Sequence, residues 1–176
     1  MPELIPQVEF SKVGMQLNVT KNQEQLLKTI RCSIITFIYG PAGTGKSFCA
    51  LAEGFRQLLS KDNKKIKKVV FVRPAVEAQE NLGFLPGDLD EKIAPYIEPF
   101  WDNSRKMLNG KFDSIQELVE VMPMAFLRGK TFDNSYVVLD EAQNTTRDQM
   151  KLFLSRTGKS ARIVVIGDTK QSDIGE

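Results

Sequence analysis

IYGPAGTGKS, residues 38–47, joins a glycine-rich turn to a final Lys-Ser pair, and the fold is predicted from this pattern. Glycines let backbone N–H groups turn inward around an anion, and a helix that follows presents its positive end to the same place. Lys46 can reach the outer phosphates, and the hydroxyl of Ser47 can ligate Mg²⁺. The stretch therefore predicts a phosphate-binding loop for a nucleoside triphosphate.

The segments around this loop predict an α/β fold. Residues 33–39, SIITFIY, are β-branched and aromatic as in a buried strand, and residues 47–59 have the pattern of a helix. Three further apolar strands are predicted at residues 68–72, 136–139 and 162–166. Strands that are apolar throughout belong in a parallel sheet with helices on both faces.

The chain of 176 residues has a length that suits one domain, and we expect residues 1–176 to form a single domain of this kind. Residues 80–134 form a long excursion between the second and third predicted strands, with helical patterns at 89–108 and 114–121. We therefore expect a helical insertion there. A further helix is expected over residues 146–156.

The composition excludes several classes of chemistry. The chain has no histidine, which rules out histidine zinc sites and Ser-His or Cys-His catalysis. Its two cysteines, Cys32 and Cys49, lack a metal-binding spacing and are predicted to be reduced thiols. The first residues do not have the basic and apolar pattern of a secretion signal, so a cytoplasmic protein is expected.

Polar residues follow each predicted strand, at the edge of the sheet where ligands of α/β proteins bind. Asp140 follows the third strand and is placed to support Mg²⁺, and Glu141 beside it could orient and deprotonate a water for attack on the γ-phosphate. Glu141 has an alternative interpretation as a solvated charge at a helix entry. Gln171, after the fourth strand, could sense the γ-phosphate.

Three arginines are candidates for contacts with other molecules. Arg73 follows the second strand, where a guanidinium could meet a nucleic-acid phosphate or a neighbouring subunit, or pair with Glu77 or Glu80. An arginine supplied to the γ-phosphate by a neighbouring subunit accelerates hydrolysis by many ATPases. Arg128 and Arg156 are the candidates for that role.

Several long motifs carry a family resemblance. GPAGTGKS at residues 40–47, the stretch RPAVEAQENLGFLPGDLDEKIAPYIEPFWD at 73–102, and residues 128–174 around VVLDEAQNTTRDQ resemble the PhoH-like ATPases, which are related to superfamily-one helicase cores. The match runs from about Gln23 to the last residues. In this family the sequence continues beyond the position of Glu176, so the carboxyl-terminal part of the family domain is expected to be absent.

The resemblance implies a RecA-like P-loop NTPase that hydrolyses ATP with Mg²⁺, acts on RNA or single-stranded nucleic acid, and assembles as a hexameric ring. It makes residues 40–47 the Walker A motif, Asp140 and Glu141 the Walker B motif, and Gln171 the third helicase-like motif. Gln23 resembles the residue that reads adenine in helicase-like ATPases, although a place on the helix surface is an equal alternative. The expected nucleotide-binding residues are Gln23, Gly40, Pro41, Ala42, Gly43, Thr44, Gly45, Lys46, Ser47 and Phe48.

Two other functions remain open at this point. A small-molecule kinase shares the phosphate loop but would require an arginine-rich lid, and adjacent acids with a downstream glutamine suit attack by water better. A nucleotide-binding interaction module without turnover is the second alternative.

Overall fold

The structure, a computed structural model of the whole chain, describes residues 10–11, 13–15, 17–62, 65–74, 89–108 and 110–168. The described strands are β1 (Ile35–Tyr39), β2 (Lys68–Arg73), β3 (Val119–Pro123), β4 (Ser135–Leu139) and β5 (Arg162–Gly167). The described α-helices are α2 (Lys21–Cys32), α3 (Lys46–Leu59), α5 (Leu89–Leu108), α6 (Phe112–Ile115) and α7 (Arg147–Ser155). The described residues also form three short 3-10 helices, η1 (Gln116–Leu118), η2 (Met124–Leu127) and η3 (Ala142–Asn144). None of these described helices is long and apolar enough to cross a membrane.

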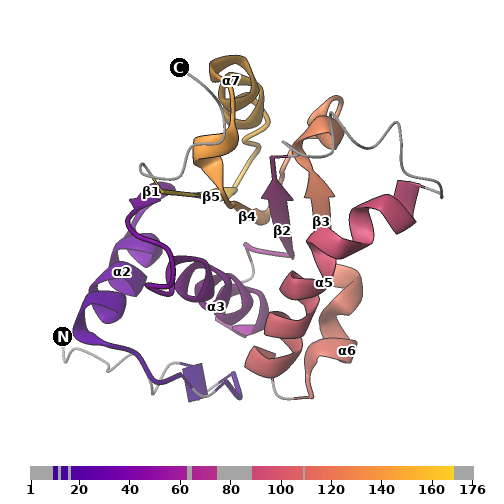
Figure 1. Cartoon of the computed structure of the whole chain (residues 1–176). Coiled ribbons are helices and arrows are strands. Elements are labelled where there is room, and N and C mark those ends of the chain that lie inside the picture. The colour runs from indigo at the N-terminus through magenta and orange to yellow at the C-terminus, as the bar shows by residue number, and fades with distance from the viewer. Residues whose placement is uncertain are drawn as a thin grey trace.

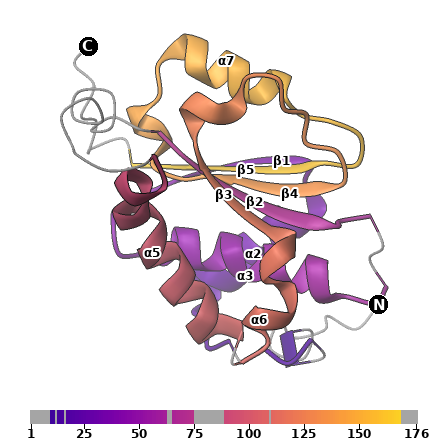
Figure 2. The same ribbon diagram turned by 90° about the vertical axis from the view of Figure 1, so that its right-hand side faces the viewer.

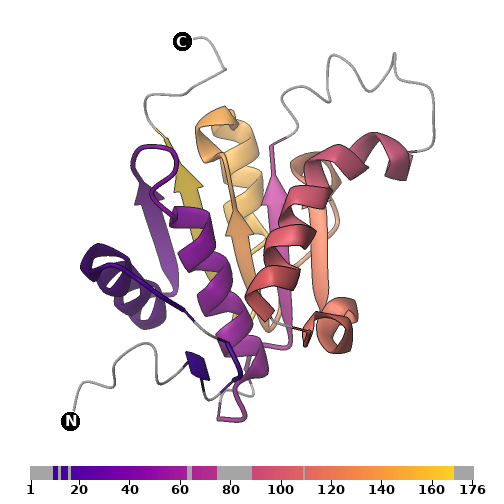
Figure 3. The ribbon, with the colours of Figure 1, turned by 60° about the horizontal axis from the view of Figure 1, so that its bottom comes forward.

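The five strands form one parallel sheet in the order β1-β5-β4-β2-β3. Figures 1 and 2 show α2, α3, α5 and α6 on one face of this sheet and α7 on the other. In Figure 3 the strands run in the same direction, and the loop from β1 to α3 lies at their carboxyl ends. The fold is therefore the α/β sandwich that the sequence predicts.

Alternation along the central strands builds a core on each face of the sheet. In β2, Val69 and Phe71 pack on the side of α3, whereas Val70 and Val72 pack on the side of α7. All four are buried, as are all five residues of β4. Helices therefore cover both faces of the sheet, as is typical of parallel sheets.

A buried carboxylate fixes α2 against α3. Glu53 of α3 is fully buried and accepts hydrogen bonds from Arg31 of α2 at 3.1 Å and from Arg56 at 2.6 Å. Burial alone would raise the pKa of Glu53, but the hydrogen bonds and charges of the two guanidinium groups outweigh it and lower the pKa. The charge cluster therefore holds the helix that precedes β1 next to the helix that follows it.

Tyr136 sets the distance between α3 and β4. Its hydroxyl donates a hydrogen bond to the carbonyl of Ala50 at 2.8 Å, and its ring lies over Gly54. A Cβ on Gly54 would stand 2.6 Å from the nearest ring carbon, so this contact requires glycine. The close approach fixes α3, whose first turn borders the phosphate-binding loop.

Two expectations about the strands were wrong. Residues 114–121 were expected to be helical, but the helix ends at Ile115 and β3 begins at Val119, so the insertion contributes an edge strand. The backbone of this segment pairs with β2, a long-range contact that overrides the local helical pattern. β1 was expected to be buried on both faces, but it is an edge strand whose Ile35, Phe37 and Tyr39 are exposed.

Candidate nucleotide site

The loop of residues 40–45 has the backbone that a phosphate site requires. Gly43 and Gly45 adopt positive φ angles of 74° and 82°, which strain any other residue. A Cβ on Gly45 would also stand 2.5 Å from the amide nitrogen of Gln23. The loop is closed by the hydroxyl of Thr44, which donates to the carbonyl of Pro41 at 2.9 Å.

The first turn of α3 and Lys46 supply positive potential to this loop. Gly45 caps α3 without a side-chain hydrogen bond, and no acidic residue lies in the first turn. Amide groups at such a helix start lack partners within the helix and can bind an anion. The ammonium of Lys46 folds over the loop and donates to the carbonyls of Gly40 at 2.6 Å and Pro41 at 2.7 Å.

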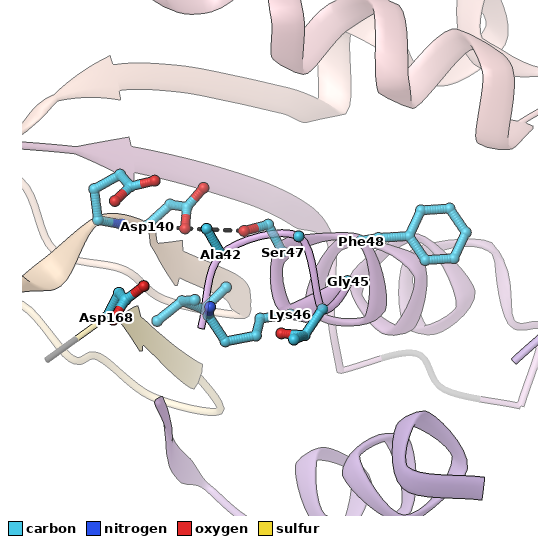
Figure 4. Close-up of a pocket in the computed structure, with 12 residues that line it drawn as sticks. Ala42, Gly45, Lys46, Ser47, Phe48, Asp140 and Asp168 are labelled. Atoms are coloured by element: carbon cyan, nitrogen blue, oxygen red, sulfur yellow. Dashed lines mark hydrogen bonds between the residues drawn. The ribbon is translucent and has the colours of Figure 1, made fainter. Parts of the chain in front are cut away.

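Ser47 and Asp140 form the pair that could hold a metal ion. The Ser47 hydroxyl donates to Oδ1 of Asp140 at 3.0 Å, and Figure 4 shows this contact beside Lys46. Burial raises the pKa of Asp140, although the charge of Arg73 and the Ser47 hydrogen bond oppose that rise. Among the described residues, no three or more acidic, cysteine or histidine side chains lie together so that they could hold a metal ion by themselves. One hydroxyl with one carboxylate suits Mg²⁺ that is shared with nucleotide phosphates, since Mg²⁺ retains several waters.

Glu141 has an unusual backbone and a more exposed carboxylate. Its φ of 54° is left-handed, a conformation that few residues other than glycine adopt. Its side chain is 45% exposed, against 8% for Asp140, so water can reach it. Asp140 is thus the buried carboxylate of the two, which suits a group that supports a metal ion. Glu141 is the more exposed one, which suits a group that activates water.

Arg73 lies against these two carboxylates. Its Nη2 is 3.8 Å from Oδ2 of Asp140 and 3.8 Å from Oε1 of Glu141. Its Nε is buried and has no hydrogen-bond partner in the described part of the chain. The alternative partners Glu77 and Glu80 lie outside the described residues. Arg73 thus reaches the acidic pair from the end of β2, a contact that its position in the sequence did not predict.

The structure brings Gln23 to the loop. Its amide nitrogen donates to the carbonyl of Thr44 at 3.1 Å, and its amide oxygen accepts from the backbone N–H of Thr20 at 3.0 Å. Gln23 therefore caps α2 and contacts the phosphate-binding loop with one side chain. Phe48 is 40% exposed, and its ring points away from Asp140 in Figure 4.

A cavity of about 250 Å³ collects most of the predicted residues. It is lined by Ala42, Gly43, Thr44, Gly45, Lys46, Ser47, Phe48, Asp140, Glu141, Ile166, Gly167 and Asp168. Gln171 lies outside the described residues. Arg128 is exposed, and Arg156 is the C-cap residue that follows α7, where its carbonyl accepts a hydrogen bond from the backbone N–H of Phe132. Neither arginine lines this cavity.

Gln143 was missed as a site residue. Its amide nitrogen donates to Oε2 of Glu141 at 2.6 Å, and its amide oxygen accepts from the backbone N–H of Asp168 at 2.9 Å. The signal in the sequence was a polar side chain two positions after Glu141, in the segment that leaves β4.

Comparisons with known proteins identify the family of the chain. A family model described as PhoH-like protein matches residues 17–176. A PhoH-like protein of Bacillus subtilis is 42% identical over 158 residues, which cover 88% of this chain and 49% of the relative. A PhoH-like protein of Mycobacterium tuberculosis (strain H37Rv) is 44% identical, with 88% and 44% covered. Protein PhoH of Escherichia coli K12 is 40% identical, with 89% and 45% covered. The chain thus spans about half the length of these relatives.

A comparison with solved structures supports the fold. The SWI2/SNF2 ATPase core of Sulfolobus solfataricus, solved in complex with dsDNA, matches with a TM-score of 0.54 at 15% identity. The match covers 87% of this chain and 32% of that one. At this identity the likeness confirms the fold of an ATPase core.

Proposed function

The chain belongs to the PhoH-like protein family, and from this premise we propose that it binds ATP with Mg²⁺ and hydrolyses it. The observation that carries the proposal is the contact between Ser47 and Asp140 at 3.0 Å, within the cavity that Lys46 and Glu141 also line. A hydroxyl and a carboxylate beside a phosphate-binding loop have the chemistry to hold Mg²⁺ on a triphosphate.

Each side chain has a distinct task in this proposal. Lys46 and the amides at the start of α3 bind the outer phosphates. To do so, the Lys46 ammonium exchanges its hydrogen bonds to the carbonyls of Gly40 and Pro41 for contacts with the phosphates. Ser47 and Asp140 hold Mg²⁺, which neutralises charge on the phosphates when bound. Glu141 orients a water and accepts its proton. We also propose that residues 1–176 form one domain.

Two variants test the chemistry. Glu141→Gln removes the base but keeps the size of the side chain, so ATP binding should persist while hydrolysis falls by about 10²–10⁴-fold. Lys46→Ala removes a phosphate contact and should weaken both binding and hydrolysis. Binding is measured by calorimetry and hydrolysis by phosphate release. Equal hydrolysis by wild type and Glu141→Gln would end the assignment of Glu141.

We extend the proposal to RNA or single-stranded DNA as the polymer on which hydrolysis acts. Family membership supports a helicase-like role. Arg73 offers a partly exposed guanidinium at the carboxyl end of β2, beside the nucleotide cavity. Binding should weaken steeply with salt, because phosphate contacts release counterions. Arg73→Ala should reduce binding more than Lys67→Ala, whose lysine is exposed just before β2 at the opposite end of the sheet. The reverse ranking would place the polymer there.

A hexameric ring is the assembly that we propose. Arg128 and Arg156 lie outside the cavity, so either would reach a nucleotide only from a neighbouring subunit. Sedimentation with Mg²⁺ and a non-hydrolysed ATP analogue tests this proposal. A monomer at micromolar concentration, with turnover per chain independent of concentration, would contradict it.

A further inference from the structure

Gln143 lies between Glu141, which follows β4, and Asp168, which follows β5. It sits in η3, where the N–H of Asn144 donates to the carbonyl of Glu141 at 2.9 Å and the hydroxyl of Thr145 donates to the carbonyl of Ala142. This turn holds the Gln143 backbone close to both Glu141 and the end of β5. Its side chain contacts one residue in each place.

The orientation of the Gln143 amide is determined by its two partners. The backbone N–H of Asp168 can only donate, so the amide oxygen must face it, at 2.9 Å. The amide nitrogen then faces Glu141 and donates to Oε2 at 2.6 Å. A glutamine fits both partners, whereas a glutamate would keep the first contact and lose the second.

The Glu141 carboxylate is thereby held from two sides. Gln143 contacts Oε2, and Arg73 lies 3.8 Å from Oε1. The Arg73 contact is longer than a hydrogen bond, so Gln143 makes the closer of the two contacts. Because the Glu141 side chain is 45% exposed and its backbone is left-handed, this hydrogen bond fixes a carboxylate that packing alone would leave free to rotate.

Gly167, the last residue of β5, lies next to Gln143. A Cβ at that position would stand 3.4 Å from the amide oxygen of Gln143 and 3.5 Å from its backbone nitrogen. These are van der Waals distances, so the turn after β4 lies directly against the end of β5. The distance between the two segments therefore sets the position of the Gln143 amide.

We propose that Gln143 is a positioning residue that holds the Glu141 carboxylate for water activation and couples it to the end of β5 through the backbone N–H of Asp168. This inference rests on the proposed hydrolysis of ATP by the same site. Glu141 remains the catalytic group, and Gln143 acts only through it.

Two variants of Gln143 test the proposal. Gln143→Leu removes both hydrogen bonds, and Gln143→Glu keeps an acceptor for Asp168 but places a second carboxylate against Glu141. Losing a hydrogen bond to a charged group should lower kcat by about 10- to 100-fold. The affinity for Mg²⁺ and a non-hydrolysed ATP analogue should change by less than about threefold, because the interactions that the bound ground state and the transition state share are unaffected. Gln149→Leu is the matched control, because its amide oxygen caps α7 by accepting from the backbone N–H of Thr146, and its loss should leave kcat unchanged.

A double mutant separates positioning from a general structural effect. With Glu141→Gln already present, Gln143→Leu should cause no further loss in single-turnover phosphate release, because its effect passes through the Glu141 carboxylate. A further loss of the same size would overturn the proposal, as would wild-type kcat in both Gln143 variants. If Gln143→Leu fails to fold, Gln143→Glu decides alone. Equal turnover by wild type and Glu141→Gln, or an inactive wild type, would overturn the proposed hydrolysis and this inference with it.

Discussion

Replacing Glu53 with glutamine tests how α2 is held next to the nucleotide site. Glu53 is buried in α3 and binds Arg31 of α2 and Arg56 of its own helix. The substitution keeps the size of the side chain and one acceptor oxygen but removes the charge. It also affects function, because α2 carries Gln23, which donates to the loop carbonyl of Thr44.

The structure sets the size of the expected effect. Removing one partner of a buried ion pair costs about 3–5 kcal/mol when the other charge stays buried. The side chains of Arg31 and Arg56 are 25% and 15% exposed, so both can gain some hydration, and glutamine still accepts one hydrogen bond. We therefore expect Glu53→Gln to lower the free energy of unfolding by about 2–3 kcal/mol at neutral pH.

The effect should depend on pH in a defined direction. The arginines lower the pKa of Glu53 below its ordinary value of 4.5, so the unfolded chain takes up this proton first as the pH falls. The stabilisation is complete above that value and is lost as the pH falls through the lower pKa of the folded state. The difference between wild type and Glu53→Gln should therefore be constant near neutral pH and shrink below about 4.5.

Urea unfolding followed by circular dichroism measures this difference. Glu24→Gln is the control, because Glu24 pairs with Lys28 on the exposed face of α2 at 3.6 Å. Such an exposed pair is worth at most about 1 kcal/mol. The stabilising role of Glu53 between Arg31 and Arg56 would be refuted if Glu53→Gln were no less stable than Glu24→Gln and if its difference from wild type did not change at low pH.

Three further predictions concern the residues around the site. Gly54→Ala places a Cβ 2.6 Å from the ring of Tyr136 and should destabilise the fold by about 1–3 kcal/mol in thermal unfolding. Burial raises the pKa of the Cys49 thiol to about 11, so a thiol reagent at neutral pH should label exposed Cys32 and reach Cys49 only after denaturation. Burial raises the pKa of Asp140, and its protonated form cannot hold Mg²⁺, so titration of Mg²⁺-dependent nucleotide binding against pH should show a loss at higher pH than an ordinary aspartate would give.

Local patterns in the sequence predicted the parts of the molecule whose structure depends on nearby residues. The glycines and Lys-Ser pair of the loop, the helix after it and the apolar β4 and β5 all carry strong local signals. β3 was missed because Val119–Pro123 is short, ends in proline and is stabilised by pairing with β2 far away in the chain. Proline is tolerated there because β3 lies at the sheet edge.

The side-chain contacts within the site were harder to predict. Asp140 and Glu141 were identified because they directly follow an apolar strand. Gln143 gains its role only because Asp168, 25 positions later, returns to the same edge. Arg73 similarly meets Asp140 only because β2 and β4 are neighbours in the sheet. Sheet order is a property of the whole fold, and no local pattern specifies it.

Phosphate release from ATP by the wild-type chain, compared in Mg²⁺ and in excess EDTA, tests the central claim most directly. We expect steady turnover in Mg²⁺ and its loss in EDTA. Ser47→Ala should turn over more slowly in Mg²⁺, because it lacks the hydroxyl that lies beside Asp140 in the metal site. Turnover that is equal in Mg²⁺ and EDTA, or no turnover by a folded wild-type chain that binds ATP, would contradict the account.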